Sequence, residues 1–301
     1  MMRSAVLAVT NHTATRKLVT DTRAGRAVAE RFVAGDTLES AIAVAKDLNG
    51  RGMRVSLDHL GEHVADLDEA SRATDAYLAC IHAIDESGID ANISVKLTQL
   101  GMGLDDRVAE KHLLQLAASA ASTGTTVTVD MEESEHTAAT IDLYEAAQRA
   151  HGNVGIAVQS YLRRTAEDLD RLIPLGGHIR LCKGAYAEPE DVAFTSGAEV
   201  DDSFDRLAGL LMAAEGVRPA IASHDDARLD HVLGIADRRS EYWEFQMLYG
   251  VRRDKQAALV EAGHQLRIYV PYGDAWYPYL TRRLAERPAN LTFFARALLG
   301  R

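Results

Sequence analysis

The sequence predicts an α/β fold, a (β/α)8 TIM-type barrel with an N-terminal helical extension. Eight short apolar runs have the length and the Val, Ile and aromatic content of strands. Segments of helical periodicity separate them, and the runs start roughly 23 to 41 residues apart, which leaves room for a crossover helix each time. Eight such units match a closed barrel, whereas an open doubly wound sheet would need a reversal in strand order that a sequence does not reveal.

The predicted strands follow the apolar runs directly. They cover residues 54–61, 92–99, 126–131, 154–159, 178–183, 219–225, 242–248 and 265–271. Between them, residues 105–122 and 203–214 place their apolar side chains on one helical face. These alternating segments predict parallel strands joined by helices.

The residues before the first strand are also predicted to be helical. One apolar stripe over 38–48 consists of Leu38, Ala41, Ile42, Ala45 and Leu48. Asp36 followed by Glu39 is typical of a helix start, and Gly50 and Gly52 are typical of a helix end. Residues 1–35 are interpreted as further helix. We therefore expect a helical extension at 1–50 and the barrel at 51–301.

The composition is that of an ordinary soluble globular protein. Of 301 residues, 47% are hydrophobic and 26% are charged, with a net charge of −11. This acidic balance argues against a nucleic-acid-binding protein, but an anionic substrate could still bind in a local basic pocket. The only cysteines are Cys80 and Cys182, so a disulfide framework is not expected. Without a secretory signal or an apolar run of ~20 residues, a cytoplasmic protein is expected.

Polar side chains accompany every predicted strand, and a barrel of this kind carries its chemistry at the carboxyl ends of the strands. Lys96 and Arg180 interrupt apolar runs, where a buried charge is costly unless it meets a counter-charge. Thr126, Thr128 and Asp130 share one face by a period of two. The remaining polar groups are Asp58, His59, Gln159, Lys183, His224, Glu244, Gln246 and Tyr269. We expect Asp130 to pair with Arg180 across the barrel mouth, either at a functional site or as a structural ion pair.

The segment after the last predicted strand carries two adjacent arginines. On a helix, Tyr279, Arg282, Arg283 and Glu286 would form one polar stripe. Two guanidinium groups on one face favour a bound anion, and their donor geometry suits a carboxylate. The alternative is a solvated, arginine-rich helix end.

Motifs for other chemistries are weak or absent in the sequence. It has no G-x-G-x-x-G after a strand, no G-x-x-x-x-G-K-[ST], no H-E-x-x-H and no G-x-S-x-G. HLGEH at 59–63 matches an inverted zinc motif in its letters. That motif needs a helix, whereas His59 ends a predicted strand and Gly61 interrupts the segment. We therefore predict no metal site.

Several longer segments match one known family in order. They are SVKLTQLG (94–101), TVDMEE (128–133), RLCKGAY (180–186), EFQMLYG (244–250) and YVPYGDAWYPYLTRRLAE (269–286), with GDTLESAIAVAKDLNGRGMRVSLDHLGE (35–62) upstream. These segments resemble the signatures of the proline dehydrogenase family. The resemblance runs from about residue 30 to the C-terminus, and the chain length resembles that of the monofunctional bacterial form.

The resemblance implies an activity, a cofactor and partners. A member of this family would bind FAD non-covalently and oxidise L-proline to pyrroline-5-carboxylate by hydride transfer to flavin N5, the first step of proline catabolism. Electrons would pass to a quinone-type acceptor, through transient contact of a cytoplasmic protein with the inner membrane surface. The product would go to a downstream aldehyde dehydrogenase.

The resemblance also implies roles for individual residues. Asp130 and Arg180 would form the catalytic pair, with Arg180 next to flavin N5. Lys96, Arg282 and Arg283 would bind the proline carboxylate, with Glu286 bracing the arginines. The proline ring would lie among Leu248, Tyr269, Tyr279 and Tyr186. The flavin would contact Met131, Gln159, Arg180, Lys183, Gly184, Ala185, Ser223 and His224.

Two departures from the family pattern concern the flavin contacts. Cys182 stands where an aliphatic residue is more usual, and Ser223-His224-Asp225 replaces the commoner Thr-His-Asn. Two other functions stay open. One is a Schiff-base lyase that uses Lys96 or Lys183 as its nucleophile. The other is a non-catalytic amino-acid-binding protein with the same anion pocket.

Overall fold

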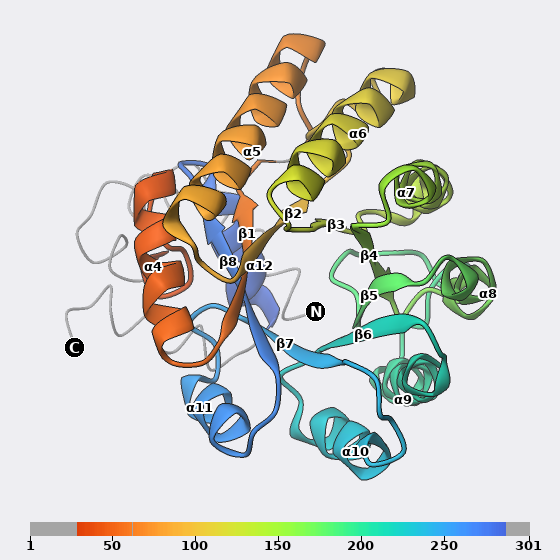
Figure 1. The fold of residues 1–301 in the computed structure, drawn as a ribbon. Coiled ribbons are helices and arrows are strands. Elements are labelled where there is room, and N and C mark those ends of the chain that lie inside the picture. Colours follow the sequence, from red (N-terminus) through yellow and green to blue (C-terminus); the bar gives the residue numbers. More distant parts are fainter. Residues whose placement is uncertain (1–28, 62, 287–301) are drawn as a thin grey trace.

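Eight parallel strands form a closed barrel in the computed structural model, which describes residues 29–61 and 63–286, with the backbone alone for 282–286. Each strand pairs with the next along the chain, and the last pairs with the first (Figure 1). The strands are β1 (Arg54–His59), β2 (Ala91–Val95), β3 (Val127–Val129), β4 (Val154–Gln159), β5 (Gly177–Cys182), β6 (Val217–Ala222), β7 (Glu244–Leu248) and β8 (Leu266–Tyr272). The predicted (β/α)8 barrel and all eight predicted strands are confirmed.

Helices surround this barrel (Figure 1). They are α4 (Leu38–Gly50), α5 (Leu67–Ser87), α6 (Asp106–Ser122), α7 (Thr137–His151), α8 (Thr165–Leu172), α9 (Gly197–Ala213), α10 (Asp226–Ala236), α11 (Arg253–Glu261) and α12 (Trp276–Glu286), with short 3-10 turns η1 (Ser134–His136) and η2 (Ile173–Leu175). Aspartates cap several of them. Asp66, for example, accepts a hydrogen bond from the backbone N–H of Glu69 at the start of α5. No described helix is long and apolar enough to cross a membrane.

The helix before the first strand is present, but its start differs from the prediction. Thr37, not Asp36, caps α4, because its extended backbone brings Oγ1 to 3.3 Å from the N–H of Ser40. The helix also includes Gly50. The prediction of helix over 1–35 falls outside the described ranges for residues 1–28. It is wrong for residues 30–35, because 30–33 form turns and a bend and 34–35 have no regular secondary structure. There the backbone N–H of Ala34 donates to the carbonyl of Pro271 in β8 instead. The domain boundary at residue 50 stays a prediction.

The inside of the barrel is polar, and its apolar core lies outside the strands. Alternate strand residues point inward, where Ser56 donates to Asn92 and Asn92 donates to Thr128. The residues between them face the helices and are fully buried, as in Val55, Leu57, Ile93, Val95, Val127, Val129, Ile156, Ile179, Leu181, Ile221, Phe245, Ile268 and Val270. Barrels of this type are more often filled with branched apolar side chains. Here polar side chains occupy the interior, and such groups can bind a ligand or take part in a reaction.

Candidate active site

A cavity of about 490 Å³ opens at the carboxyl ends of the strands. Its wall contains every predicted site residue whose side chain the structure describes. These are Lys96, Asp130, Met131, Gln159, Arg180, Lys183, Gly184, Ala185, Tyr186, Ser223, His224, Leu248, Tyr269 and Tyr279. Asp58 and Gln246 also line the cavity, although the sequence predicted no role for either of them. Asp58 follows Ser56 by the same period of two that singled out Asp130, and this signal could have found it.

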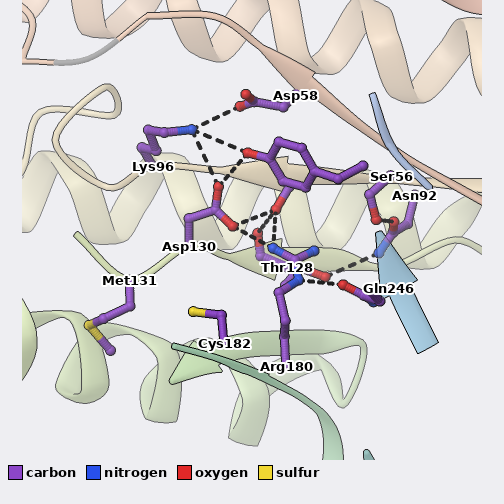
Figure 2. A network of polar contacts seen from close by, with 12 residues as sticks. Ser56, Asp58, Asn92, Lys96, Thr128, Asp130, Met131, Arg180, Cys182 and Gln246 are labelled. Carbon is purple, nitrogen blue, oxygen red and sulfur yellow. Dashed lines mark hydrogen bonds and ion pairs between the residues drawn. The ribbon is translucent and has the colours of Figure 1, made fainter. Parts of the chain in front are cut away.

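Lys96 is held between two carboxylates (Figure 2). Its Nζ donates to Asp58 Oδ1 at 3.0 Å, to Asp130 Oδ2 at 3.3 Å and to the Tyr269 hydroxyl at 3.4 Å. Lys96 is the first residue after β2, not within it as predicted, and its side chain is 9% exposed. The loop that carries it is anchored by Thr98, whose backbone N–H and hydroxyl both donate to the buried carboxylate of Glu132. The ammonium group is therefore fixed in place by buried acidic partners.

The predicted Asp130–Arg180 pair is present and belongs to a wider network (Figure 2). Arg180 Nη1 donates to Asp130 Oδ1 at 2.5 Å and to Ser94 Oγ at 3.0 Å. Ser94 Oγ and the Tyr269 hydroxyl each donate to Asp130, at 2.8 and 2.7 Å. Arg180 also lies over the Tyr269 ring, at 5.3 Å from its centroid. Polar groups from β2, β5 and β8 and from the loop after β2 thus converge on Asp130.

The two carboxylates beside Lys96 have different electrostatic environments. Burial raises the pKa of Asp130, but the charges of Lys96 and Arg180 outweigh it and hold the pKa below its usual value. Burial also raises the pKa of Asp58, and there the attraction of Lys96 is not enough, so the pKa stays above its usual value. Asp130 is therefore the more acidic of the two carboxylates.

The cavity also has features that fit a bound planar group. Gln159 Oε1 and Arg180 Nη2 are buried and have no hydrogen-bond partner in the described part of the chain. An orphaned acceptor and an orphaned donor in one cavity suit the edge of a heterocycle that carries both N–H and carbonyl groups. Gly184 has φ +115°, and a Cβ there would lie 2.2 Å from the Tyr161 ring. Only glycine lets this segment pack against Tyr161 and form the cavity wall.

Other loops that bear predicted cofactor contacts are also fixed by polar contacts. Lys183 lies between Asp201 and Asp225, at 2.5 and 2.7 Å. His224 Nε2 accepts a hydrogen bond from the backbone N–H of Leu248. These contacts tie the ends of β5, β6 and β7 to one another.

The helix after β8 brings Tyr279 to the cavity, as predicted. Leu280 points elsewhere, into a small apolar cluster with Phe32 and Leu60. Arg282, Arg283 and Glu286 lie in α12, but their side chains fall outside the described part of the structure. Their predicted carboxylate-binding role therefore stays a prediction.

The two histidines of HLGEH do not share a helix. His59 ends β1 and its ring packs against Tyr77 and Tyr272. His63 faces Glu133 on the surface, at 3.6 Å. Among the side chains described, those of residues 29–61 and 63–281, no three of His, Cys, Asp or Glu are grouped closely enough to hold a metal ion.

Comparison with known proteins identifies the family. A family model described as Proline dehydrogenase matches residues 41–296. The chain belongs to the proline dehydrogenase family. It is 38% identical over 274 residues to Proline dehydrogenase 1 of Bacillus subtilis (strain 168), and 35% identical over 280 residues to Proline dehydrogenase of Deinococcus radiodurans. Each alignment covers 90% of this chain and 90% of the relative.

The chain is also similar to parts of larger proteins. The chain is 30% identical over 317 residues to Bifunctional protein PutA of Escherichia coli (strain K12), where it covers 24% of the relative. A crystal structure of proline utilization A from Bdellovibrio bacteriovorus, inactivated by N-propargylglycine, superimposes with a TM-score of 0.82 at 25% identity. That alignment covers 87% of this chain and 33% of the other.

Proposed function

We propose that this chain catalyses the FAD-dependent oxidation of L-proline to pyrroline-5-carboxylate, with electrons passed on to a quinone-type acceptor. Family membership supports the reaction class, and relatives named as proline dehydrogenases match along 90% of their length. The observation that carries the proposal is the buried Lys96–Asp130–Arg180 cluster. It lies at the carboxyl ends of the strands and leaves Arg180 Nη2 unpaired at the cavity.

The residues that would hold FAD non-covalently surround the cavity. They are Met131, Gln159, Arg180, Lys183, Gly184, Ala185, Ser223 and His224. Bound FAD would supply the acceptor for the hydride that leaves the substrate carbon beside the nitrogen. Arg180 contributes a buried positive charge. Its unpaired Nη2 would stabilise negative charge that develops nearby during the reaction. Asp130 holds that guanidinium in place and stays ionised itself.

Recognition of the proline carboxylate needs a net positive charge near the cavity. The buried cluster at the carboxyl ends of the strands contains two cations, Lys96 and Arg180, and two carboxylates, Asp58 and Asp130. Their charges largely compensate one another. We therefore infer that Arg282 and Arg283 of α12 provide the excess positive charge, with Lys96 as a third ligand. Leu248, Tyr269 and Tyr279 would enclose the ring. The substrate amine must be neutral when the hydride leaves, so turnover should rise with pH until that proton is lost.

The two rival functions make different demands on the same residues. A Schiff-base nucleophile must be a neutral amine, whereas two carboxylates stabilise Lys96 as an ammonium ion. Lys183 likewise lies between Asp201 and Asp225. A non-catalytic binding protein would not need the orphaned donor and acceptor of Arg180 and Gln159. The arrangement favours the dehydrogenase over both.

The decisive experiment uses the purified full-length chain under anaerobic conditions. We expect a yellow protein whose flavin absorbance bleaches on addition of L-proline and returns with a soluble quinone. Bleaching by L-proline but not by D-proline would show a stereospecific site. A colourless protein trapped by borohydride with substrate would replace the proposal with the lyase. Proline binding without bleaching of bound flavin would replace it with the binding protein.

The physiological context is proposed on the same basis. We infer a cytoplasmic enzyme that meets a membrane quinone at the inner membrane surface and hands its product to an aldehyde dehydrogenase. The PutA relatives are named as bifunctional, which supports a downstream second activity. Co-sedimentation with quinone-containing lipid vesicles, compared between oxidised and proline-reduced protein, tests the membrane contact. Equal and negligible binding of both forms would contradict it.

A further inference from the structure

Gln246 links Arg180 to the buried interior of the barrel (Figure 2). It lies on β7, 3% exposed, and its Oε1 accepts a hydrogen bond of 2.6 Å from Arg180 Nε. Arg180 is on β5, so the contact crosses over β6. The residues of β6 in register with these two are Ala220 and Ala222, whose small side chains leave room for it.

The contacts of Arg180 determine where its third nitrogen points. Nη1 is held by Asp130 and Ser94, and Nε is held by Gln246. A guanidinium group is planar, so fixing two of its nitrogens fixes the direction of the third. That third nitrogen, Nη2, is the buried one without a partner. Gln246 therefore supplies one of the two constraints that set the orientation of the group.

The orientation of the Gln246 amide is set in turn by Glu244. Gln246 Nε2 donates to Glu244 Oε1 at 2.7 Å. A carboxylate only accepts hydrogen bonds, so the amide must turn its nitrogen toward Glu244 and its oxygen toward Arg180. Glu244 is fully buried, and Arg267 and Tyr242 each donate to it, at 2.7 and 2.5 Å. This carboxylate is a fixed reference point below the site.

We propose that Gln246 is a positioning residue for the oxidation, which aims Arg180 Nη2 at the bound flavin and substrate, with Glu244 fixing the Gln246 amide. The inference rests on the proposed function. It assigns Gln246 no contact with the reacting atoms, and its effect on the reaction passes through Arg180. Removing the amide leaves the charge of Arg180 in place but releases one of its two constraints.

The test compares Gln246→Leu and Gln246→Glu with wild type, and uses Gln148→Leu as a matched control. Gln148 is also a buried glutamine, but it bonds the backbone of Val154 and Leu175, and it does not line the carboxyl-end cavity. For flavin-loaded Q246L we expect kcat to fall roughly 10- to 100-fold with little change in KM for proline. Q246E keeps an acceptor for Arg180 and should recover much of kcat. It should also be the less stable of the two variants, because it buries a second carboxylate beside Glu244.

Two further measurements do not depend on turnover. The reduction potential of the bound flavin should be lower in Q246L than in wild type, because a misaligned cation stabilises the reduced, more negative flavin less well. In protein labelled with nitrogen-15 arginine, the Nε–H of Arg180 should be protected from solvent exchange in wild type and in Q148L. The same N–H should exchange faster in Q246L.

The outcomes separate this inference from the proposed function. If wild type does not bleach with proline, the proposed function fails. If wild type bleaches and Q246L shows the same kcat, potential and Nε–H exchange, the positioning role is overturned. A Q246E protein no more active than Q246L would also overturn the positioning role. A purely structural role predicts that the less stable variant, Q246E, is not the more active one. Should Q246L not fold, Gln246→Asn carries the same comparison, because its amide is one methylene too short to reach Arg180.

Discussion

The two ends of the barrel contain similar chemical groups arranged for different purposes. The cavity at the amino end is the larger, about 580 Å³ against about 490 Å³, and it is lined by arginines, acidic residues, His178 and Tyr242. Every buried side-chain nitrogen or oxygen of its described lining residues has a partner. The cavity at the carboxyl end contains Gln159 Oε1 and Arg180 Nη2, which have none. We therefore place the candidate site at the carboxyl end because of its unsatisfied polar atoms, and not because of cavity size.

An ion pair between an arginine and a carboxylate occurs at each end of the barrel, and we assign the two pairs different roles. Arg267 and Glu244 at the amino end form a contact of 2.7 Å, and Arg267 Nη1 also donates to the carbonyl of Val55 and to Asn92. Arg180 and Asp130 at the carboxyl end form one of 2.5 Å that leaves part of the guanidinium unsatisfied. We interpret the first pair as structural and the second as functional. Paired substitutions at the two ends test this difference.

The largest expected effect comes from Arg180→Met compared with Arg267→Met. Arg180→Met should lower kcat about 100- to 1000-fold, the usual cost of removing one preorganised electrostatic group. Arg267→Met should instead lower the free energy of unfolding by about 3–5 kcal/mol, because it leaves Glu244 buried and unpaired. Its effect on kcat should be far smaller, since Arg267 reaches Arg180 through intermediate residues such as Glu244 and Gln246. Steady-state kinetics and urea unfolding of both variants check this, and equal losses of kcat would contradict the division.

The next effect concerns binding of the substrate carboxylate by α12. Arg282→Met and Arg283→Met should each raise KM for proline roughly 10- to 100-fold, the cost of losing a charged hydrogen bond. Arg253→Met is the control, because Arg253 is exposed on α11 and lies over the Tyr249 ring. Unchanged KM values in both α12 variants would remove the carboxylate-binding assignment and leave Lys96 as its sole candidate.

A smaller effect is expected from alanine at two glycines. Gly184 at the carboxyl end and Gly124 at the amino end both have positive φ, at +115° and +72°. A Cβ at Gly124 meets nothing within 4 Å, whereas one at Gly184 meets the Tyr161 ring at 2.2 Å. Gly124→Ala should therefore cost about 1 kcal/mol of stability and leave flavin content unchanged. Gly184→Ala should cost about 1–3 kcal/mol and lower the flavin content as well. Flavin-to-protein absorbance ratios measure this, and equal flavin content in both variants would argue against Gly184 as part of the cofactor site.

The smallest effect is on the pH dependence of stability. Burial raises the pKa of Glu244, but Arg267 and His178 hold it well below its usual value, so its contribution is lost as pH falls through the folded-state pKa. Asp58 has the opposite effect on stability. Burial raises its pKa in the folded state, so protonation of Asp58 stabilises the folded protein as pH falls. Glu244→Gln should flatten the decline of unfolding free energy below about pH 4. Asp58→Asn should remove a gain in unfolding free energy that wild type makes at higher pH, as pH falls from the raised folded-state pKa of Asp58 toward about pH 4. Each effect should be about 1 kcal/mol per pH unit at most. Urea unfolding at several pH values measures the slopes, and a steeper decline in Glu244→Gln would contradict the assigned direction.

The sequence was enough to predict the architecture and much of the candidate site. Strand alternation is local, so the apolar outer face and the polar inner face follow from a period of two, and Asp130 could be paired with Arg180 because both point inward. The predicted start of α4 is wrong, because Thr37 has the extended backbone and the side-chain hydrogen bond of the cap, and a sequence does not show which of two neighbouring capping residues is used. The contacts from Asp58 to Lys96 and from Gln246 to Arg180 join residues 38 and 66 positions apart. Which inward residues touch depends on strand register and on the small side chains of β6, and neither is visible in one sequence.

The most direct measurement is a crystal structure of the protein with cyclopentane carboxylate. This ligand keeps the ring and the carboxylate of proline but lacks the C–N bond that would be oxidised. We predict that its ring lies in the carboxyl-end cavity beside Tyr269 and Leu248, with its carboxylate at Lys96 and the arginines of α12. A ligand bound only in the larger cavity at the amino end, among His178, Tyr242 and Arg267, would contradict the account.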